Sequence, residues 1–182
     1  MGKYMITKSY RSPLGMITLA ADARGLTGLW FEDQAHYGAT LDGEGVPNGL
    51  GSASAVLDYA WAWLDTFFAG HAPAYTPPLH LIGTPFQLEV WSVLQSVPRG
   101  STVTYSWVAD EIYRRRLAAG DGRPTSPRAV GAAVGRNPVS IIVPCHRVVG
   151  ASGALTGYAG GLDRKKWLLD VEGRCRNNDA RQ

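Results

Sequence analysis

The sequence has few cysteines, few charged residues and no long hydrophobic run. Among its 182 residues are 2 cysteines, too few for the disulfide framework of a small secreted protein. No run of about 18 apolar residues is present, so we expect no membrane-spanning helix and no membrane partner. The first eight residues, MGKYMITK, lack the apolar core of a signal peptide. We therefore expect a cytoplasmic protein.

The composition is that of a folded protein, and its charge is unevenly distributed. Hydrophobic residues make up 45% and charged residues 18%, which is typical of globular chains. Residues 1–84 contain 4 Lys and Arg against 7 Asp and Glu, whereas residues 85–182 contain 14 against 8. A basic half indicates contact with a polyanion, and nucleic acid is the first candidate. A basic surface without any partner is the alternative.

The first half predicts a small sheet with one helix. Short β-prone runs at 4–10, 16–21 and 26–31 are separated by turn-forming residues, which favours a hairpin or a three-stranded meander. Residues 32–51 are polar and rich in glycine, and we expect a loop there. Apolar residues at helical spacing then predict a helix that begins at Ser52 or Ser54 and ends at Gly70. Its aromatic residues fit core packing better than a ligand platform.

The domain organisation follows from a proline-rich segment near the middle of the chain. Residues 71–83 lack any helical period, and we interpret them as a linker with a short strand at 79–82. Residues 1–83 are then an N-terminal α/β scaffold domain. Residues 84–173 are then a C-terminal domain, and residues 174–182 are a polar tail.

The second half is predicted to be mainly helical. Thr84 and Gln87 form a capping box around Pro85, a strong signal for a helix start. The apolar spacing predicts helices over about 84–97, 106–118, 128–135 and 162–171, an extended stretch at 102–105 and a strand at 139–143. We expect Gly173 to end the last helix.

The helix predicted at 128–135 has an unusual composition, RAVGAAVG. Two helices joined by a turn are typical of a helix-turn-helix, whose second helix enters a DNA groove. Ala129 and Gly131 cannot read base edges, but a helix with such small side chains can approach the minor groove, where the base pattern is degenerate. Close helix–helix packing is the alternative. Arg128 fits a phosphate ligand or a wedge into the base stack.

The segment Pro144-Cys145-His146-Arg147 is the candidate reactive site. A nucleophilic cysteine needs thiolate character, which a nearby base or positive charge provides. Successive residues of a strand point to opposite faces, so either the chain turns after Pro144 or a water relays the proton to His146. Glu172 is a candidate to orient that base. The alternative is an inert buried cysteine beside a hydrogen-bonded histidine.

These residues and their context closely resemble the O6-alkylguanine-DNA alkyltransferases, also called methylated-DNA–protein-cysteine methyltransferases. The matching stretches are 84–87, 104–105, 128–131, 137–138, 144–148, 157–161, 166–169 and 172–173. The resemblance implies an α+β fold with two domains: a ribonuclease H-like N-terminal domain, with a small antiparallel sheet and a helix, and a mostly helical C-terminal domain of the winged-helix or helix-turn-helix type. It also implies DNA repair by single-turnover transfer of an alkyl group from O6-alkylguanine to Cys145; O4-alkylthymine is a second candidate substrate.

The resemblance also implies roles for individual residues. Cys145 would be the alkyl acceptor, and His146 would take its proton through a water. Glu172 would orient His146, Asn137 would brace the turn that holds the cysteine, and Tyr105 would help to protonate the departing guanine.

The resemblance further implies that the target nucleotide is flipped out of the duplex from the minor-groove side, because such a pocket cannot reach a stacked base. Other residues would bind this flipped base and the DNA. Tyr158 would wall the pocket, the Ala159 N–H would donate to the base, and the carbonyls of Cys145 and Val148 would accept from its exocyclic amine. The helix with Ala129 and Gly131 would lie in the minor groove, and Arg128 would fill the gap that the flipped nucleotide leaves. The partner would be double-stranded DNA containing O6-alkylguanine, bound by a monomer with no cofactor and no metal.

The sequence departs from this family pattern in one region. The chain between Tyr105 and Arg128 is about nine residues longer than the pattern, and its added arginines at 114–116 can supply phosphate contacts. Ser126 and Pro127 stand where two alanines are usual. Three other functions remain open to test: a DNA-damage sensor without an acceptor cysteine, a cysteine hydrolase and a fused transcriptional regulator. Cys145 is present, which argues against the sensor. We find no oxyanion-hole motif, which argues against the hydrolase, and the chain is short for a fused regulator.

Overall fold

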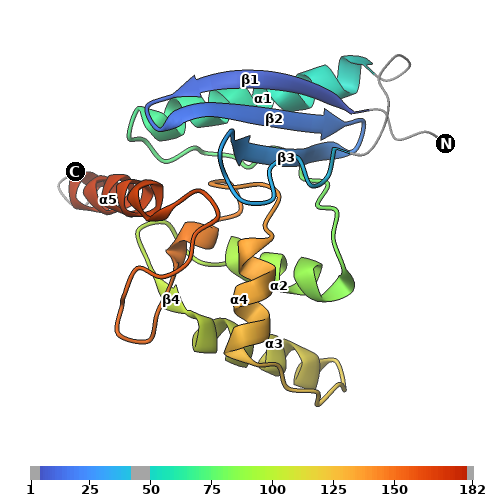
Figure 1. Ribbon diagram of the computed structural model, residues 1–182, viewed down its shortest axis with the longest axis vertical. Helices are drawn as coiled ribbons and strands as arrows, with labels where there is room; N and C mark the ends of the chain where they lie inside the picture. The colour runs from blue at the N-terminus through green and yellow to red at the C-terminus, as the bar shows by residue number, and fades with distance from the viewer. Residues whose placement is uncertain (1–4, 42–49, 180–182) are drawn as a thin grey trace. The chain divides into compact units, whose positions relative to one another are not determined.

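The computed structural model describes residues 5–41 and 50–179, with the side chains of 5–41 and 51–173. The chain forms two compact units, and each contains its own helices and strands (Figure 1). The first comprises Met1–Ile82 and Pro138–Ser140, and the second comprises Gly83–Asn137 and Ile141–Gln182. The expected α+β architecture is confirmed.

The sheet of the first unit is an antiparallel meander. Its strands are β1 (Ile6–Ser12), β2 (Gly15–Asp22) and β3 (Gly25–Phe31), in that order. The two turns are closed by short polar side chains, as turn chemistry requires. The Ser12 hydroxyl donates to the Gly15 carbonyl, and Asp22 accepts from the backbone N–H groups of Arg24 and Gly25. The three predicted strands are therefore confirmed, although β1 extends two residues further than expected.

Helix α1 (Leu50–Phe68) covers one face of this sheet (Figure 1). Its buried residues Leu57, Ala60, Leu64 and Phe67 are spaced three or four apart, as an amphipathic helix requires. The helix begins before Ser52 and Ser54, so the prediction that one of these serines caps it is wrong. Packing of the apolar face decides where the helix starts more strongly than the serine signal does.

Two segments from outside the meander attach to β3 by single β-bridges. Leu79 pairs with Leu26, and Val139 pairs with Leu29. The short strand expected at 79–82 is therefore only one bridge. The strand expected at 139–143 is also wrong, because the chain turns at Ile141, whose φ is 70°. Such a conformation is rare for a β-branched residue and costs about 1–3 kcal/mol, so surrounding contacts must impose it.

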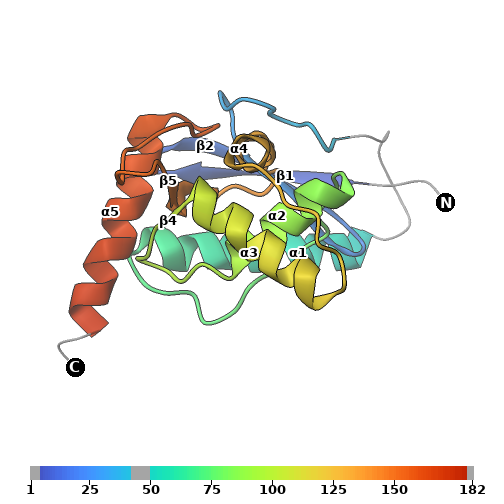
Figure 2. The same ribbon diagram turned by 90° about the horizontal axis from the view of Figure 1, so that it is seen from below.

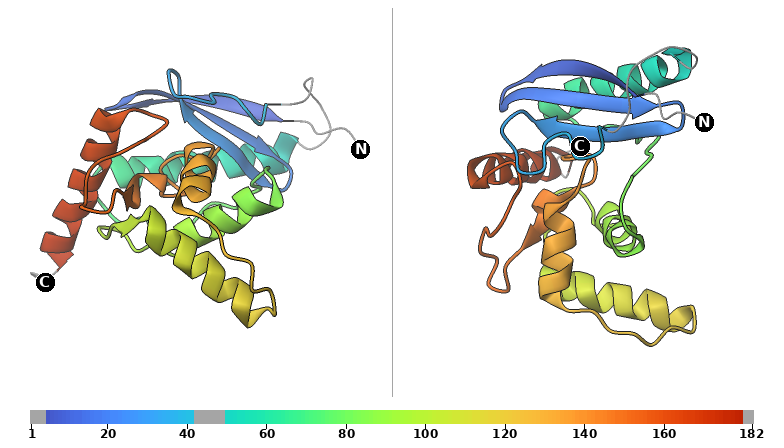
Figure 3. Two further views of the ribbon diagram at one scale, coloured as in Figure 1. Left: turned by 60° about the horizontal axis from the view of Figure 1, so that its bottom comes forward. Right: turned by 45° about the vertical axis from the view of Figure 1, so that its right-hand side comes forward.

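The second unit contains a group of three helices, α2 (Pro85–Gln95), α3 (Tyr105–Ala118) and α4 (Pro127–Gly135), which contact one another (Figures 2 and 3). Each begins at a predicted or adjacent capping residue: Thr84 with the full capping box, Thr104 and Ser126. Their common core includes Val90, Trp91, Leu94, Ile112 and Val130. The indole N–H of Trp91 donates to the Ala133 carbonyl at 2.9 Å, which satisfies the one polar atom of that buried ring.

The candidate thiol lies in the rest of the second unit. Strand β4 (Val103–Thr104) pairs in parallel with β5 (Val148–Val149), directly after the short helix η1 (Cys145–Arg147). The last helix, α5, runs Leu162–Asp179. The prediction that Gly173 ends it is therefore wrong, and residues 174–179 of the expected tail are helical. A glycine inside a helix costs only about 1 kcal/mol relative to alanine. Residues 180–182 lie outside the described residues.

Candidate active site

The candidate thiol lies at the start of a single tight turn. After Pro144, the chain forms the 3₁₀-helix η1, in which the Arg147 N–H donates to the Pro144 carbonyl at 3.0 Å. This is the turn after proline that the sequence left open as one of two alternatives. Because a 3₁₀-helix has three residues per turn, Cys145, His146 and Arg147 point in three different directions. Cys145 contacts Asn137, whereas His146 and Arg147 share the carboxylate of Glu172.

Cys145 is buried, and the side chain of Asn137 contacts its sulfur. The side-chain amide of Asn137 donates to the Cys145 Sγ at 3.1 Å and to the Val143 carbonyl at 2.8 Å. Asn137 thus binds both the thiol and the backbone before it. Burial raises the pKa of Cys145, while the amide of Asn137 and the charge of Lys165 oppose that shift. The thiol therefore keeps its proton near neutral pH, and a base is needed to remove it.

Glu172 on α5 connects His146 with Arg147. Its carboxylate accepts from His146 Nε2 at 3.0 Å, and from Arg147 Nη2 at 2.7 Å and Nε at 2.9 Å. The backbone N–H of Gly100 adds a contact at 3.3 Å. Burial alone would raise the pKa of Glu172, but the hydrogen bonds from His146 and Arg147 outweigh it and hold that pKa well below its usual range. Glu172 is therefore a fixed negative charge inside the unit.

The protonation state of His146 follows from this contact. Burial lowers the pKa of His146 more strongly than Glu172 raises it, so the imidazole is neutral near pH 7. Since ionised Glu172 can only accept, the single proton of the ring sits on Nε2. The other nitrogen, Nδ1, has no hydrogen-bond partner within the part of the chain that the structure describes. It carries a free lone pair, as a proton acceptor must.

Lys165 is a site residue that the sequence analysis missed. Its side chain is 0% exposed, and Nζ donates to the carbonyls of Val148 at 2.6 Å, Thr156 at 2.7 Å and Gly157 at 3.3 Å. Burial lowers the pKa of Lys165, and the neighbouring Cys145 opposes that shift. The signal was present: Lys165 and Glu172 are seven residues apart on one helix, and that spacing places both on the same face.

Tyr105 is the first residue of α3 and lies near the thiol. Its hydroxyl donates to the Thr156 carbonyl at 3.3 Å and lies beside Gly157, and its ring lies against Gly131 of α4. Burial raises the pKa of Tyr105, the hydrogen bond to Thr156 opposes that shift, and a thiolate at Cys145 would add to it. The phenol therefore keeps its proton and can act as a donor. Tyr158 and Ala159 follow in the same loop and are half-buried.

Helix α4 divides its small residues between two uses. Ala133, together with Val130 and Val134, is buried against the other helices, which fits the packing interpretation of the sequence. Ala129 and Gly131 are half-buried, and Arg128 is exposed at the start of the helix. The face that carries Arg128 is therefore available to a large partner. The packing and groove-binding interpretations are compatible, since they concern different faces.

Neither a metal cluster nor a membrane helix is found in the parts of the chain that the structure describes. Among the side chains described, those of 5–41 and 51–173, no group of three or more His, Cys, Asp and Glu residues is arranged to hold a metal ion. None of the helices there is both long and apolar enough to cross a membrane. Cys175 is part of α5, but its side chain lies outside the described residues.

Comparison with known proteins gives consistent matches along the chain. Residues 5–81 match the family model described as 6-O-methylguanine DNA methyltransferase, ribonuclease-like domain, and residues 85–174 match its DNA binding domain. A methylated-DNA–protein-cysteine methyltransferase of Mycobacterium tuberculosis is 42% identical over 161 residues, 88% of each chain. One from Methanosarcina acetivorans is 40% identical over 169 residues, 91% of this chain and 97% of its own.

Solved structures agree with the sequence comparisons. The crystal structure of the Mycobacterium tuberculosis O6-methylguanine methyltransferase is similar, with a TM-score of 0.72 and 39% identity over 93% of each chain. A crystal structure of OGT from the same organism in complex with DNA matches equally well, with a TM-score of 0.72. At this identity and coverage, the likeness extends over both units.

Proposed function

The chain belongs to the methylated-DNA–protein-cysteine methyltransferases, a DNA-repair activity, and from this premise we propose that Cys145 is the residue that accepts the alkyl group. In the transfer, the Cys145 sulfur forms a bond to the alkyl carbon while the bond from that carbon to guanine O6 breaks. The guanine leaves with the bonding electrons and gains a proton. The thioether that results is stable, so each molecule acts once.

The observation that carries this proposal is the arrangement of Asn137, Cys145, His146 and Glu172 in one buried cluster. His146 Nδ1 takes the thiol proton through one water, because the turn points the two side chains apart. The negative charge of Glu172, 3.0 Å from Nε2, stabilises the imidazolium that forms. Asn137 donates to the sulfur and so stabilises the developing thiolate.

We propose O6-alkylguanine in double-stranded DNA as the substrate. A thiol buried in this way cannot reach a stacked base, so the nucleotide must be flipped out. Tyr105 then donates a proton to the departing guanine, and Tyr158 forms a wall of the pocket. The Ala159 N–H donates to the base. The carbonyls of Cys145 and Val148 accept from its amine.

The proposed DNA contact is the exposed start of α4. Small residues such as Ala129 and Gly131 allow the helix to lie in the minor groove without reading the sequence. Arg128 fills the gap left by the flipped nucleotide. We further propose that the protein acts as a monomer in the cytoplasm. Light scattering with and without a DNA duplex tests its oligomeric state.

Mass spectrometry of the intact and digested protein tests the function directly. After incubation with a duplex that contains one O6-methylguanine, we expect one added CH₂ group on the peptide with Cys145 and none on the peptide with Cys175. Cys145→Ser should gain nothing. Repeated turnover with unmodified protein would instead indicate a hydrolase and contradict the proposal. A duplex with O4-methylthymine, tested in competition, shows whether the second candidate substrate is also accepted.

A further inference from the structure

The three arginines at 114–116, which the sequence suggested as phosphate ligands, occupy different environments. Arg114 and Arg115 pair with Glu111 on their own helix, at 2.6 and 2.8 Å. Such pairs between neighbouring turns stabilise a helix by only a few tenths of a kcal/mol. Arg116 instead reaches from α3 to Glu89 on α2. Arg115 also donates to the hydroxyls of Ser92 and Ser96 at the end of α2, both at 3.3 Å, but of the three only Arg116 forms an ion pair between two helices.

The guanidinium of Arg116 has interaction partners on several sides. Arg116 Nε and Nη2 donate to the two carboxylate oxygens of Glu89 at 2.8 and 2.6 Å, a bidentate pair. Nη1 donates to the Arg123 carbonyl at 3.0 Å, and the group lies 5.8 Å from the centre of the Phe86 ring. The side chain is 18% exposed, against 60% for Arg114. A guanidinium held in this way is poorly placed to bind a phosphate.

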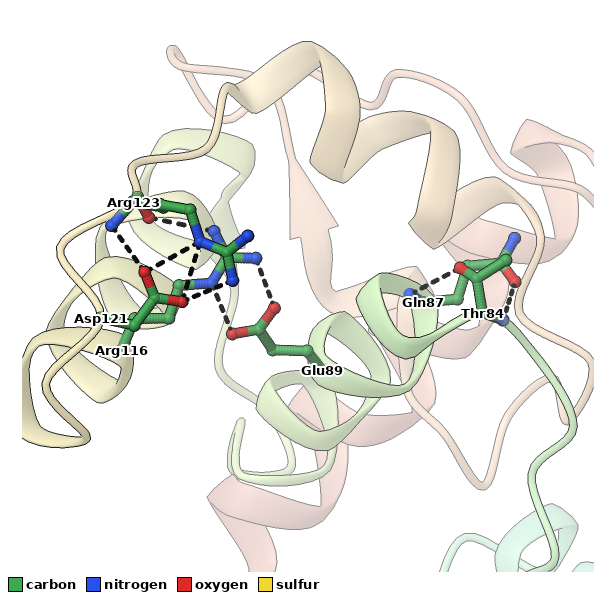
Figure 4. Close-up of polar contacts among 6 residues, drawn as sticks. All are labelled: Thr84, Gln87, Glu89, Arg116, Asp121 and Arg123. Carbon is green, nitrogen blue, oxygen red and sulfur yellow. Dashed lines mark hydrogen bonds and ion pairs between the residues drawn. The ribbon is translucent and has the colours of Figure 1, made fainter.

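The contact with Arg123 extends this pair into the loop after α3. The Asp121 N–H donates to the Arg116 carbonyl at 2.7 Å, and the Arg123 guanidinium donates to the Asp121 carboxylate at 2.8–3.1 Å. Figure 4 shows the four side chains in one continuous network from α2 to the loop. Gly120, with φ 81°, allows the sharp turn that begins the loop.

The loop leads directly into the proposed DNA-binding helix. Three residues after Arg123, the Ser126 hydroxyl accepts from the Ala129 N–H at 3.2 Å and caps α4. Arg128 follows within the first turn. The backbone path between α3 and Arg128 therefore depends on how the segment 119–126 is fixed.

We propose that Arg116 and Glu89 form a clamp that fixes the loop 119–126 and so presents α4 and Arg128 to DNA in one orientation. This inference rests on the proposed DNA contact of α4. A loop with two glycines would otherwise lose its conformational freedom when DNA binds, and that loss would weaken the affinity. With the clamp in place, the loop is ordered before binding. Arg116 and Glu89 are positioning residues that act through α4.

Substitution of Glu89 separates the clamp from a simple effect of charge. If Arg116 acted through its charge, Glu89→Gln would strengthen DNA binding, because it removes a negative charge from a surface that meets phosphates. The clamp predicts the opposite sign: Glu89→Gln, Arg116→Lys and Arg116→Ala each weaken binding, by about tenfold for the loss of a charged hydrogen-bonded pair. The double variant should bind no more weakly than Arg116→Ala alone.

The experiment measures two quantities for each full-length variant. Affinity for a duplex is measured at several salt concentrations, and alkylation of Cys145 is measured with free O6-methylguanine base, which needs no DNA contact. We expect the clamp variants to lose duplex affinity and to keep the wild-type rate with the free base. Arg114→Ala is the matched control: it removes one positive charge next to Arg116 but no contact between helices, so it reports the effect of charge alone.

The outcomes separate the clamp from the proposed function. Tighter or unchanged duplex binding by Glu89→Gln would overturn the clamp. Failure of the wild-type protein to be alkylated at Cys145 by either substrate would overturn the proposed function instead. If Arg116→Ala does not fold, Arg116→Lys keeps the charge and loses the bidentate geometry, and hydrogen exchange of 119–126 in that variant must increase if the clamp holds the loop.

Discussion

Single residues set the reactivity of the candidate thiol, and Lys165 is the one that tests this most cleanly. Its buried ammonium lowers the pKa of Cys145 against the effect of burial. We expect Lys165→Met to raise the thiol pKa and to slow alkylation at neutral pH, because less thiolate is available. The measurement is the pH dependence of Cys145 alkylation by a small electrophile.

The control for this prediction is the neighbouring exposed lysine. Lys166→Met removes the same charge one residue away, outside the buried face, and should leave the thiol pKa near the wild-type value. Lys165→Met also removes the hydrogen bonds to the carbonyls of Val148, Thr156 and Gly157. The free energy of unfolding of this variant should therefore fall by about 1–3 kcal/mol. An equal thiol pKa in the two variants would show that Lys165 is only structural.

His146 gives a second prediction at this scale, on stability and pH. Burial lowers the pKa of His146 in the folded protein, whereas in the unfolded chain it titrates near 6.5. The unfolded state therefore binds more protons below that pH, and stability falls as the pH falls, by at most about 1.4 kcal/mol per pH unit for this residue. Unfolding by denaturant at pH 7, 6 and 5 measures the slope, which His146→Gln should reduce. An identical slope in that variant would contradict the assignment of a neutral imidazole.

How far the site could be predicted from sequence is also clear at the residue scale. Cys145, His146 and Glu172 came from a short motif and its spacing, and the structure brings them together in the second unit. Lys165 was missed because a lysine is usually exposed. In the sequence, only the seven-residue spacing to Glu172 indicates that Lys165 lies on the buried face of the last helix.

Among the helices, the starts marked by local signals at Thr84 and Ser126 were predicted well, whereas the signals at Ser52, Ser54 and Gly173 misled. Thr84 and Ser126 carry side-chain oxygens that accept from backbone N–H groups two or three residues inside the helix, and this chemistry is visible in the sequence. The segment after Asn137 was not predictable in this way. Its single bridge pairs Val139 with Leu29, and no local pattern indicates a partner that far away in the sequence.

The helix caps give a prediction at the element scale. Ser126→Ala and Thr84→Ala each remove one cap, and each should destabilise the protein by about 1 kcal/mol. Only Ser126→Ala should also weaken DNA binding, since it loosens the start of α4. Thermal unfolding and duplex affinity of both variants measure the two effects. Equal losses of affinity would mean that the helix start of α4 has no special part in the contact.

The net charge of +3 for the whole chain is the sum of an acidic first half and a basic second half, and this difference matters for DNA binding. Residues 85–182 hold 14 of the 18 Lys and Arg, and apart from Arg128 the helix proposed to meet DNA carries side chains too small to read bases. Affinity for undamaged DNA should therefore come mainly from phosphates, which makes it dependent on salt and independent of sequence.

Two unrelated duplexes of equal length test this last prediction. We expect affinities within about threefold of each other, because base contacts would otherwise add about 1–3 kcal/mol of discrimination each. Both affinities should fall with the same slope when log K is plotted against log salt concentration, since the slope counts phosphate contacts. A large preference for one duplex would show that side chains read bases, and would contradict the minor-groove placement of α4. Such indifference to sequence suits an enzyme that must find damage anywhere in DNA.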